Sequence, residues 1–313
     1  MTSFWKNKSV LITGAHGFVG NNLVNFLFDS GASLLTPNKQ ELDLVDQQAT
    51  RSYFKNNYFK NNNIDVVIHL AGMVGGIWAN KNALGDFFYQ NAMMGINALH
   101  YSYEFGVKKF VGLAAGCGYP DTKIPYSEDN FWNGLPDMNS YGYSMAKKNL
   151  IIQSWAYRDQ YGFDSTILLP ANLYGPYDNF DLESSHVVPA LVRKFVESND
   201  KVSVWGSGKA SREFIYVEDV CRAISDCCTK QNLRGPYNLG TGKETSIREL
   251  VETITDITRF KGVVEWDSSK PDGQERRYYD MSNFKKDVGY IPSTSLRKGL
   301  ETTIEWYNND KNS

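Results

Sequence analysis

The sequence predicts an α/β fold: a doubly wound, Rossmann-type parallel sheet with a smaller C-terminal α/β unit for the substrate. Three observations support this prediction. Short apolar, β-branched runs alternate with segments of helical periodicity through the first half of the chain. A glycine-rich turn follows the first of these runs. Prolines, glycines and aromatic residues become frequent after about residue 170, which indicates a less regular second unit.

The expected strands are short and almost wholly apolar, as is typical of parallel strands buried on both faces. They cover residues 9–13, 32–36, 65–71, 109–115 and 165–171. Apolar residues that share one face predict helices at residues 21–28, 187–196, 217–230, 246–260 and 296–307. The asparagine-rich stretch 56–63 is expected to be a loop beside a helix end.

Length sets the expected domain organisation. The 313 residues suffice for two units that each have a core. We expect a dinucleotide-binding domain from residues 1–171 together with about 213–240, and a substrate-binding domain from residues 172–212 and 241–313. The second domain would lie over the carboxyl ends of the strands, where open α/β sheets bind their ligands.

Charge and cysteine content argue against several classes of function. The formal net charge of −2 gives no field that would attract nucleic acid or an anionic membrane. No apolar run approaches the roughly 18 residues of a membrane span. The first residues lead directly towards a strand, so no signal peptide is expected. The four cysteines fit neither a disulfide framework nor a zinc site, so we expect no metal and a reducing, cytoplasmic setting.

A glycine-rich turn, residues 13–20, joins the first expected strand to the first helix. Gly14 would permit a tight turn, and Gly17 would let a pyrophosphate approach the helix N-terminus. Gly20 would allow the helix to pack closely on the strand. The turn therefore predicts dinucleotide binding, and the alternative is a purely structural glycine turn.

The end of the second expected strand bears on the choice of cofactor. An acidic residue there would bind the ribose 2′-hydroxyl of NAD. No acid precedes Glu41, whereas Lys39 could meet a 2′-phosphate, so the sequence favours NADP(H). The alternative is that Lys39 is an ordinary surface lysine.

Tyr143 and Lys147 lie one helical turn apart and so share a face. The ammonium group would favour the phenolate form of Tyr143, since the ordinary tyrosine pKa is about 10. Work near neutral pH would need that pKa lowered by roughly 3 units. The pair resembles the proton-donating pair of short-chain dehydrogenase/reductases, although this spacing also arises by chance on helix surfaces.

Further segments narrow the class. Residues 173–180, 185–195, 204–208, 212–214 and 270–273, and also 41–44 and 74–77, resemble the GDP-L-fucose synthase family of extended short-chain dehydrogenase/reductases. The resemblance runs from about Lys8 to Trp306. It implies NADPH-dependent 3,5-epimerisation and 4-reduction of a GDP-4-keto-6-deoxy-hexose, with the second domain binding the nucleotide sugar.

The resemblance also implies roles for individual residues. Tyr143 and Lys147 match the residues of the hydride step, whereas Cys117 and His186 match the acid/base pair that epimerises C3 and C5. The implied cofactor contacts are Gly14, His16, Gly17, Phe18, Val19, Gly20, Lys39, Asp43, Leu44, Leu70, Ala71, Gly72, Lys147, Pro170, Asn172 and Leu173. The implied substrate contacts are Asn172, Arg193, Lys194, Trp205, Arg212 and Asp272. A homodimer is expected through the helix within residues 87–103 and the helix that carries Tyr143.

The chemistry of these residues agrees with such roles. Inversion of a carbon needs a base on one face of the sugar and an acid on the other, and a thiolate and an imidazole suit this near neutral pH. The alternatives are that Cys117 is a small core residue and that His186 is a helix cap or core histidine. The remaining candidates, expected to be structural, are Cys221, Cys227, Cys228, His69 and His100.

One position departs from the family pattern. The extended reductases carry a serine or threonine two residues before the cysteine position, to bond the substrate ketone, and here that residue is Ala115. Loss of such a donor can raise the barrier by about 2.7–4 kcal/mol. Either Tyr143 works largely alone, a water or a nearby side chain compensates, or the substrate differs in shape. The alternatives are therefore a deoxyheptose or colitose precursor as substrate, an epimerase with weak reductase activity, or a non-catalytic, nucleotide-sensing Rossmann protein.

Overall fold

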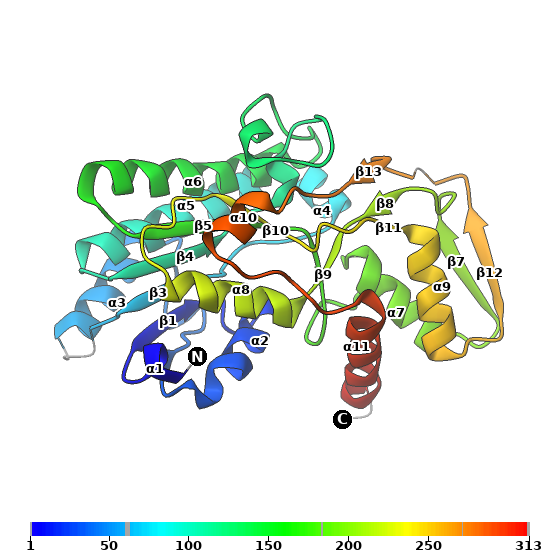
Figure 1. Cartoon of the computed structure of the whole chain (residues 1–313), viewed down its shortest axis with the longest axis horizontal. Coiled ribbons are helices and arrows are strands. Elements are labelled where there is room, and N and C mark those ends of the chain that lie inside the picture. Colours follow the sequence, from blue (N-terminus) through cyan, green and yellow to red (C-terminus); the bar gives the residue numbers. More distant parts are fainter. Residues whose placement is uncertain (1, 60–62, 183, 271, 312–313) are drawn as a thin grey trace.

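A six-stranded parallel sheet forms the centre of the N-terminal part (Figure 1). The computed structural model describes residues 2–59, 63–182, 184–270 and 272–311. The strands of this sheet are β1 (Ser9–Thr13), β2 (Ser33–Leu35), β3 (Val66–His69), β4 (Lys109–Leu113), β5 (Ser165–Pro170) and β10 (Tyr237–Leu239). Their order is β2-β1-β3-β4-β5-β10. The second strand lies on one side of β1, and all later strands of the sheet lie on the other side.

The strand register brings the carboxyl ends of neighbouring strands together. Thr13 at the end of β1 is paired with His69 at the end of β3, and His69 is paired with Gly112 of β4. The loops that follow these strands therefore emerge at one edge of the sheet, beside the point where the strand order reverses. Open α/β sheets bind their ligands at this point.

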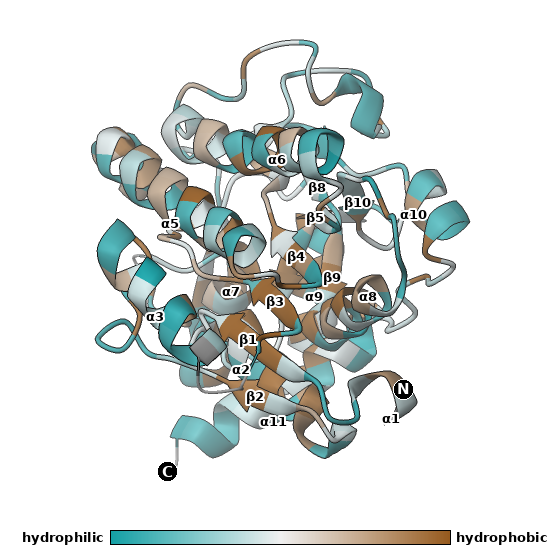
Figure 2. Ribbon diagram, turned by 90° about the vertical axis from the view of Figure 1, so that its left-hand side faces the viewer, coloured by the Kyte–Doolittle hydropathy of each residue, from teal (hydrophilic) through white to brown (hydrophobic). Residues whose placement is uncertain are grey.

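Helices cover both faces of this sheet (Figure 2). One face carries α3 (Gln47–Phe59), α5 (Leu84–Glu104) and α6 (Tyr141–Tyr161), and the other carries α2 (Phe18–Leu27) and α8 (Val217–Thr229). The central strands β3, β4 and β5 are consequently buried along their whole length. The shorter elements of this part are α1 (Thr2–Trp5), α4 (Ile77–Asn82) and 3₁₀ turns at Phe28–Ser30, Gly116–Gly118 and Glu128–Asn130.

The C-terminal part is a smaller assembly of helices and short sheets (Figure 1). Its helices include α7 (Val187–Glu197), α9 (Ile247–Thr258) and α11 (Leu296–Lys311). Its strands pair as β6 (Asn172–Tyr174) with β9 (Phe214–Tyr216), β7 (Lys201–Trp205) with β12 (Val263–Asp267), and β8 (Ser211–Arg212) with both β11 (Thr245–Ser246) and β13 (Arg276–Arg277). After β13 the chain returns to the first sheet, where α10 (Ser282–Asp287) packs beside β10.

Glu213 ties these two parts together between β8 and β9. It is fully buried, and its carboxylate accepts hydrogen bonds from the backbone nitrogens of Gly242 at 2.6 Å and Tyr279 at 2.8 Å. Its carbonyl oxygen accepts a hydrogen bond from the side-chain amide of Asn172 at 2.8 Å. Burial raises the pKa of Glu213, while the backbone donors favour its charged form. The segment after β13 is thereby fixed against the end of β5.

The predicted parallel sheet is confirmed, and most strands are shorter than predicted at their carboxyl ends. One local prediction is wrong. Residues 56–59, predicted as a loop, belong to α3, because Phe54 and Tyr58 of this helix pack their rings against Phe105 at 6.3 and 6.1 Å. Residues 60–62 of that predicted loop lie outside the described residues.

Candidate active site

The turn after β1 has a backbone that only glycine can follow at two positions. Gly14 has a φ of +72°, and a Cβ there would lie 2.7 Å from the backbone nitrogen of Ala71. A Cβ on Gly20 would lie 2.6 Å from backbone atoms of the same turn. α2 begins after Gly17 without a side-chain cap, so backbone N–H groups at its positive end can meet an anion. This cradle fits the pyrophosphate of a dinucleotide.

The end of β2 lies beside this cradle. Nε2 of His16 is 3.0 Å from the carbonyl oxygen of Thr36, just beyond β2. The Glu41 carboxylate accepts a hydrogen bond at 2.9 Å from the backbone nitrogen of Asn38, so this acid helps to close the turn that follows. Lys39 is exposed on the same turn. A ribose bound here would therefore meet an exposed lysine and a carboxylate already engaged by the backbone.

The other cofactor candidates are spread over four segments of the N-terminal part and the start of β6. Leu70, Ala71 and Gly72 follow β3, Phe18 and Val19 begin α2, and Pro170, Asn172 and Leu173 lie where β5 gives way to β6. Asp43 is partly buried, and its carboxylate accepts a hydrogen bond from the backbone nitrogen of Val45 at 3.0 Å. Leu44 is buried, and its carbonyl oxygen accepts a hydrogen bond from Asn97 at 2.8 Å.

Tyr143 and Lys147 reach the carboxyl edge of the sheet from the start of α6. Nζ of Lys147 is buried, donates a hydrogen bond to the carbonyl oxygen of Leu113 at 3.3 Å and lies 5.7 Å from the centre of the Tyr143 ring. A Cβ on Gly72 would lie 3.3 Å from the same Nζ. Phe87 of α5 packs edge-on against Tyr143, with 6.3 Å between ring centres. The predicted pair therefore lies beside the loop that follows β3.

The pKa of Tyr143 is shifted in the direction opposite to the sequence-based prediction. Burial raises the pKa of Tyr143, and the neighbouring Cys117 raises it further. Burial lowers the pKa of Lys147 to about 8. The predicted lowering of the Tyr143 pKa is thus wrong, because desolvation dominates and the ammonium group bonds Leu113. Tyr143 is consequently a neutral phenol near neutral pH, the form that can donate a proton.

Cys117 lies in the 3₁₀ turn after β4, against the start of α6. The Ser144 hydroxyl is 3.2 Å from Sγ of Cys117 and 3.2 Å from its carbonyl oxygen. Ser144 is fully buried, whereas Cys117 is partly accessible. The remaining cysteines are buried in α8, where burial raises the pKa of each thiol: Cys221, Cys227 and Cys228. Their role in packing agrees with the sequence-based prediction.

Tyr279 and Arg277 approach Cys117 from the C-terminal part. Neither residue was predicted from the sequence. A Cβ on Gly116 would overlap the Tyr279 hydroxyl and lie 3.2 Å from Nη2 of Arg277. The Arg277 guanidinium is within hydrogen-bonding reach of that hydroxyl, and both groups interact electrostatically with Cys117. In the sequence, only their position shortly after the segment 270–273 could have suggested them.

Arg277 and Arg212 place two positive charges side by side. They are paired in register between β13 and β8. Burial and the charge of Arg277 lower the pKa of Arg212, so the two guanidinium groups repel each other. Nε of Arg277 is also buried with no hydrogen-bond partner in the described structure. A diphosphate bound between or beside these groups would reduce the repulsion and offer Nε of Arg277 a hydrogen-bond acceptor.

His186 is the N-cap residue of α7. The carbonyl oxygen of the nearby Ser184 is 3.7 Å from the Cβ position of Gly76, so the start of α7 lies against the loop that follows β3. Water can reach the His186 side chain, yet partial desolvation by the surrounding protein lowers its pKa. The imidazole is therefore mostly neutral near neutral pH and can accept a proton.

Some substrate candidates of the C-terminal part already form hydrogen bonds within the protein, whereas one is largely exposed. Lys194 donates a hydrogen bond to the carbonyl oxygen of Ser203 at 3.0 Å, and Arg193 donates to Glu197 at 3.1 Å. Trp205 is 65% exposed, with the Lys270 ammonium 5.5 Å from its ring centre.

Asp272 acts as a clamp between two loops. Its two carboxylate oxygens accept hydrogen bonds from the backbone nitrogen and hydroxyl of Ser207 at 2.6 and 2.7 Å. These hydrogen bonds lower the pKa of Asp272. The carboxylate therefore holds the loop after β7 to the loop after β12, next to the exposed Trp205.

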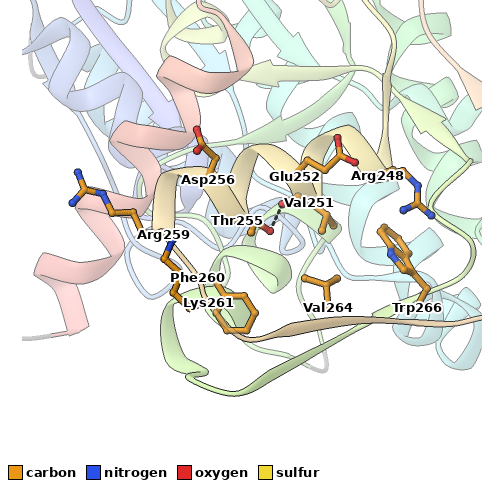
Figure 3. A pocket seen from close by; sticks show the side chains of 10 residues that line it. All are labelled: Arg248, Val251, Glu252, Thr255, Asp256, Arg259, Phe260, Lys261, Val264 and Trp266. Atoms are coloured by element: carbon orange, nitrogen blue, oxygen red, sulfur yellow. Dashed lines mark hydrogen bonds between the residues drawn. The ribbon is translucent and has the colours of Figure 1, made fainter.

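A separate groove lies between α9 and β12 (Figure 3). Arg248 stacks on the ring of Trp266 at 4.5 Å at one end of the groove. Charged, polar and apolar side chains of α9, of the residues that follow it and of β12 line the remainder. The groove contains none of the predicted site residues, which lie instead at and near the carboxyl edge of the six-stranded sheet and in the C-terminal part.

Comparison with known proteins identifies the family. Residues 10–240 match the family model described as the NAD dependent epimerase/dehydratase family. The chain is 36% identical to GDP-L-fucose synthase 1 of Arabidopsis thaliana over 308 residues, which covers 96% of this chain and 94% of that protein. The chain belongs to the NAD-dependent epimerase/dehydratase family.

Solved structures with a similar fold agree with that assignment. A GDP-6-OMe-4-keto-L-xylo-heptose reductase from C. jejuni is 30% identical, with a TM-score of 0.88 over 97% of this chain and 98% of the other. A GDP-L-fucose synthetase from Naegleria fowleri bound to NADP is 27% identical, with a TM-score of 0.87 over 98% and 96% of the two chains. Membership of this NAD-dependent family indicates a nicotinamide dinucleotide as the cofactor.

Two further properties concern the described residues alone. None of their helices is both long and apolar enough to cross a membrane. No group of three or more histidine, cysteine, aspartate or glutamate side chains among them is arranged to hold a metal ion.

Proposed function

We propose that this protein catalyses the NADP(H)-dependent 3,5-epimerisation and 4-reduction of a GDP-4-keto-6-deoxy-hexose, as a GDP-L-fucose synthase does. One observation carries the proposal: the thiol of Cys117 lies against the start of the helix that bears Tyr143 and Lys147. A reductase needs only the tyrosine and lysine, whereas an enzyme that also inverts carbons beside a ketone needs further acid/base groups.

The reduction uses the neutral phenol of Tyr143. A nicotinamide cofactor held here would supply the hydride for C4 of the sugar. Tyr143 donates its proton to the C4 oxygen as negative charge develops there, and the buried Lys147 stabilises the resulting phenolate. Because the pKa of Lys147 is lowered to about 8, the ammonium group can also release a proton to re-form the phenol.

The epimerisation uses Cys117 and His186 on opposite faces of the sugar. One group removes a proton from the carbon next to the ketone, and the electron pair of the broken C–H bond moves onto the ketone oxygen. The other group delivers a proton to the opposite face of that carbon. The neutral imidazole favoured by the lowered pKa of His186 suits the role of base.

The nucleotide diphosphate is proposed to bind across the C-terminal part. Arg212 and Arg277 would hold the phosphates, which supports the choice of a nucleoside-diphosphate sugar. Trp205, with Lys270 beside its ring, offers an exposed aromatic face for the base. Asp272 would fix this face rather than contact the substrate, because Ser207 engages both of its oxygens.

The choice of NADP(H) over NAD(H) is supported by the turn after β2. Lys39 is exposed there and Glu41 is engaged by the backbone of Asn38. A 2′-phosphate would gain a cation, whereas a 2′-hydroxyl would find Glu41 already occupied.

We further propose that the chain works as a homodimer with two domains in each protomer. The domain boundaries are those expected from the sequence, with residues 213–240 completing the dinucleotide domain through α8 and β10. α5 and α6 lie side by side (Figure 2) and expose Phe88, Ile96 and Ile152, which supports association through these helices. The four free thiols fit a cytoplasmic setting.

A GDP-4-keto-heptose, or a colitose precursor, is the second candidate substrate. It is favoured by the absence of a hydroxyl at Ala115, two residues before the thiol. A sugar of different shape could bond the site without this donor.

The proposed function is tested by incubation with GDP-4-keto-6-deoxy-mannose and NADPH in deuterated water. We expect deuterium at C3 and C5 together with oxidation of NADPH. Exchange without oxidation would replace the proposal by an epimerase with weak reductase activity. Absence of both, with turnover of a GDP-4-keto-heptose under the same conditions, would replace the hexose by the heptose. Absence of all turnover would overturn the enzyme assignment.

A further inference from the structure

Cys117 must exist in two protonation states if it acts as proposed. As a base it begins as a thiolate: an S–H bond forms while the C–H bond beside the ketone breaks, and the electron pair moves onto the ketone oxygen. As an acid it returns the proton to carbon. A neighbour that stabilises the thiolate without losing its own proton would assist both directions.

Ser144 has the geometry of such a neighbour. Its Oγ is 3.2 Å from Sγ and 3.2 Å from the carbonyl oxygen of Cys117, and its one proton can be donated to only one of them at a time. A thiolate is the stronger acceptor, whereas a neutral thiol is a weaker acceptor than a carbonyl oxygen. We propose that Ser144 is a positioning residue whose hydroxyl turns to the sulfur of Cys117 in the thiolate and to its carbonyl oxygen in the thiol.

The packing around both residues keeps this geometry fixed. Ser144 is fully buried, and its backbone nitrogen donates to the Ser140 carbonyl oxygen at 2.9 Å in the first turn of α6. The turn that holds Cys117 is closed by a hydrogen bond from the Gly118 nitrogen to the Ala115 carbonyl oxygen at 3.1 Å. The hydroxyl rotor is thus the part that can respond when the sulfur gains or loses a proton.

Other groups also face Cys117 and must be separated from Ser144. Tyr143 and Lys147 interact with it from α6, and Arg277 and Tyr279 interact with it from β13 and the residues beyond. Lys147 and Arg277 attract a negative sulfur by charge. The substitution Ser144→Ala leaves all four groups in place and removes one hydrogen bond, so it isolates the hydroxyl.

The test measures how fast iodoacetamide alkylates Cys117 in the full-length protein as a function of pH, with the modified site located by mass spectrometry. Only the thiolate reacts, so the pH midpoint of the rate reports how well the site stabilises it. We expect Ser144→Ala to raise the midpoint by about one pH unit, which corresponds to losing one hydrogen bond to a charged acceptor. At pH values well below the midpoint, the alkylation rate should fall about tenfold.

The matched control is Ser154→Ala. Ser154 is also buried in α6, but its hydroxyl bonds Ser165 at 2.8 Å instead of Cys117. Its midpoint should equal that of the wild type. Alkylation of the buried Cys221 reports any general loosening of the fold, and it should stay absent in both variants. An unchanged midpoint in Ser144→Ala, or equal shifts in both serine variants, would overturn the proposal.

The inference rests on the proposed function for its catalytic meaning, but the alkylation test needs no substrate. Failure of the chain to process any keto sugar would overturn the proposed function and leave the midpoint shift intact. In an active enzyme, Ser144→Ala should move the pH profile of deuterium exchange upward by the same amount as the alkylation midpoint. An exchange profile that stays in place while the alkylation midpoint moves would refute the part of Ser144 in catalysis.

Discussion

Tyr143 lies where desolvation outweighs the nearby positive charge, so it remains a neutral phenol with a raised pKa. A donor with this protonation state is needed when a ketone becomes an alcohol. We predict that Tyr143→Phe lowers the rate of keto-sugar reduction by about 10²–10⁴-fold, measured as NADPH consumption, because water is a poorer donor. The control is Tyr141→Phe, two residues earlier on the same helix and exposed. Equal rates in the two variants would remove Tyr143 from the reduction.

The buried charge of Lys147 destabilises the folded chain to an extent that depends on pH. Its pKa is about 8 in the folded chain against 10.5 for an ordinary lysine. Between about pH 8 and 10.5 the unfolded chain binds more protons than the folded chain, so the free energy of unfolding rises with pH. Below about pH 8 the buried charge lowers the free energy of unfolding by its full amount, roughly 3 kcal/mol. We predict that Lys147→Met is inactive in reduction but about 1–3 kcal/mol more stable near neutral pH.

Urea unfolding at several pH values measures that change in the free energy of unfolding. The gain in Lys147→Met should shrink as pH rises from about 8 to 10.5. Lys285→Met, at an exposed position of α10, should show neither the gain nor its pH dependence. A gain that is constant across this range would mean that packing, and not the buried charge, separates the two proteins.

Gly116 is required because Tyr279 occupies the space beside it. A Cβ at position 116 would overlap the Tyr279 hydroxyl and lie 2.9 Å from the ring carbon that bears it. We predict that Gly116→Ala costs about 1–3 kcal/mol of stability in thermal unfolding, since the buried ring must move. Adding Tyr279→Leu should recover part of that loss. Gly85→Ala in α5, where a Cβ meets nothing within 4 Å, should be neutral or stabilising, and a large loss there would discredit the steric explanation.

At the scale of elements, the strands were the most predictable part of the fold. β1, β3, β4 and β5 are buried on both faces, so each is a continuous apolar run that stands out in the sequence. The two-residue strands β8, β11 and β13 carry no such pattern, because their pairing depends on tertiary contacts. α3 extends through residue 59 for the same reason: aromatic packing on Phe105 outweighs the polar composition of its end.

The residues of the candidate site also differ in whether the sequence could reveal them. Tyr143 and Lys147 were identified in the sequence because their spacing of one helical turn carries a signal, whereas Cys117 was identified through the family resemblance. Arg277 and Tyr279 were not identified, because they are distant from Cys117 in the sequence and only the tertiary structure brings them to it. The direction of the Tyr143 pKa shift also depends on burial by distant segments, which spacing alone does not reveal.

At the scale of the whole molecule, the site is assembled at the junction of the two parts. The N-terminal part supplies Tyr143 and Lys147 from α6 and Cys117 from the turn after β4. The C-terminal part supplies Arg212 and Arg277. Glu213 holds the junction through hydrogen bonds from the backbone nitrogens of Gly242 and Tyr279. A substrate that spans the junction would therefore have its sugar near the sheet and its phosphates over β8 and β13, as the proposed nucleoside-diphosphate sugar requires.

The outer face of α5 and α6 leads to a prediction for the whole assembly. Ile96 on α5 is 37% exposed and Ile152 on α6 is 47% exposed, and water would be removed from both if two copies packed through these helices. We predict that the double variant Ile96→Glu/Ile152→Glu sediments as a monomer while the wild type sediments as a dimer, because four carboxylates would face one another at the interface. Val263→Glu, at a 61% exposed site on β12, should remain dimeric. A wild-type monomer, or a dimer that survives the double substitution, would place the association elsewhere or exclude it, and circular dichroism would show whether the variant is still folded.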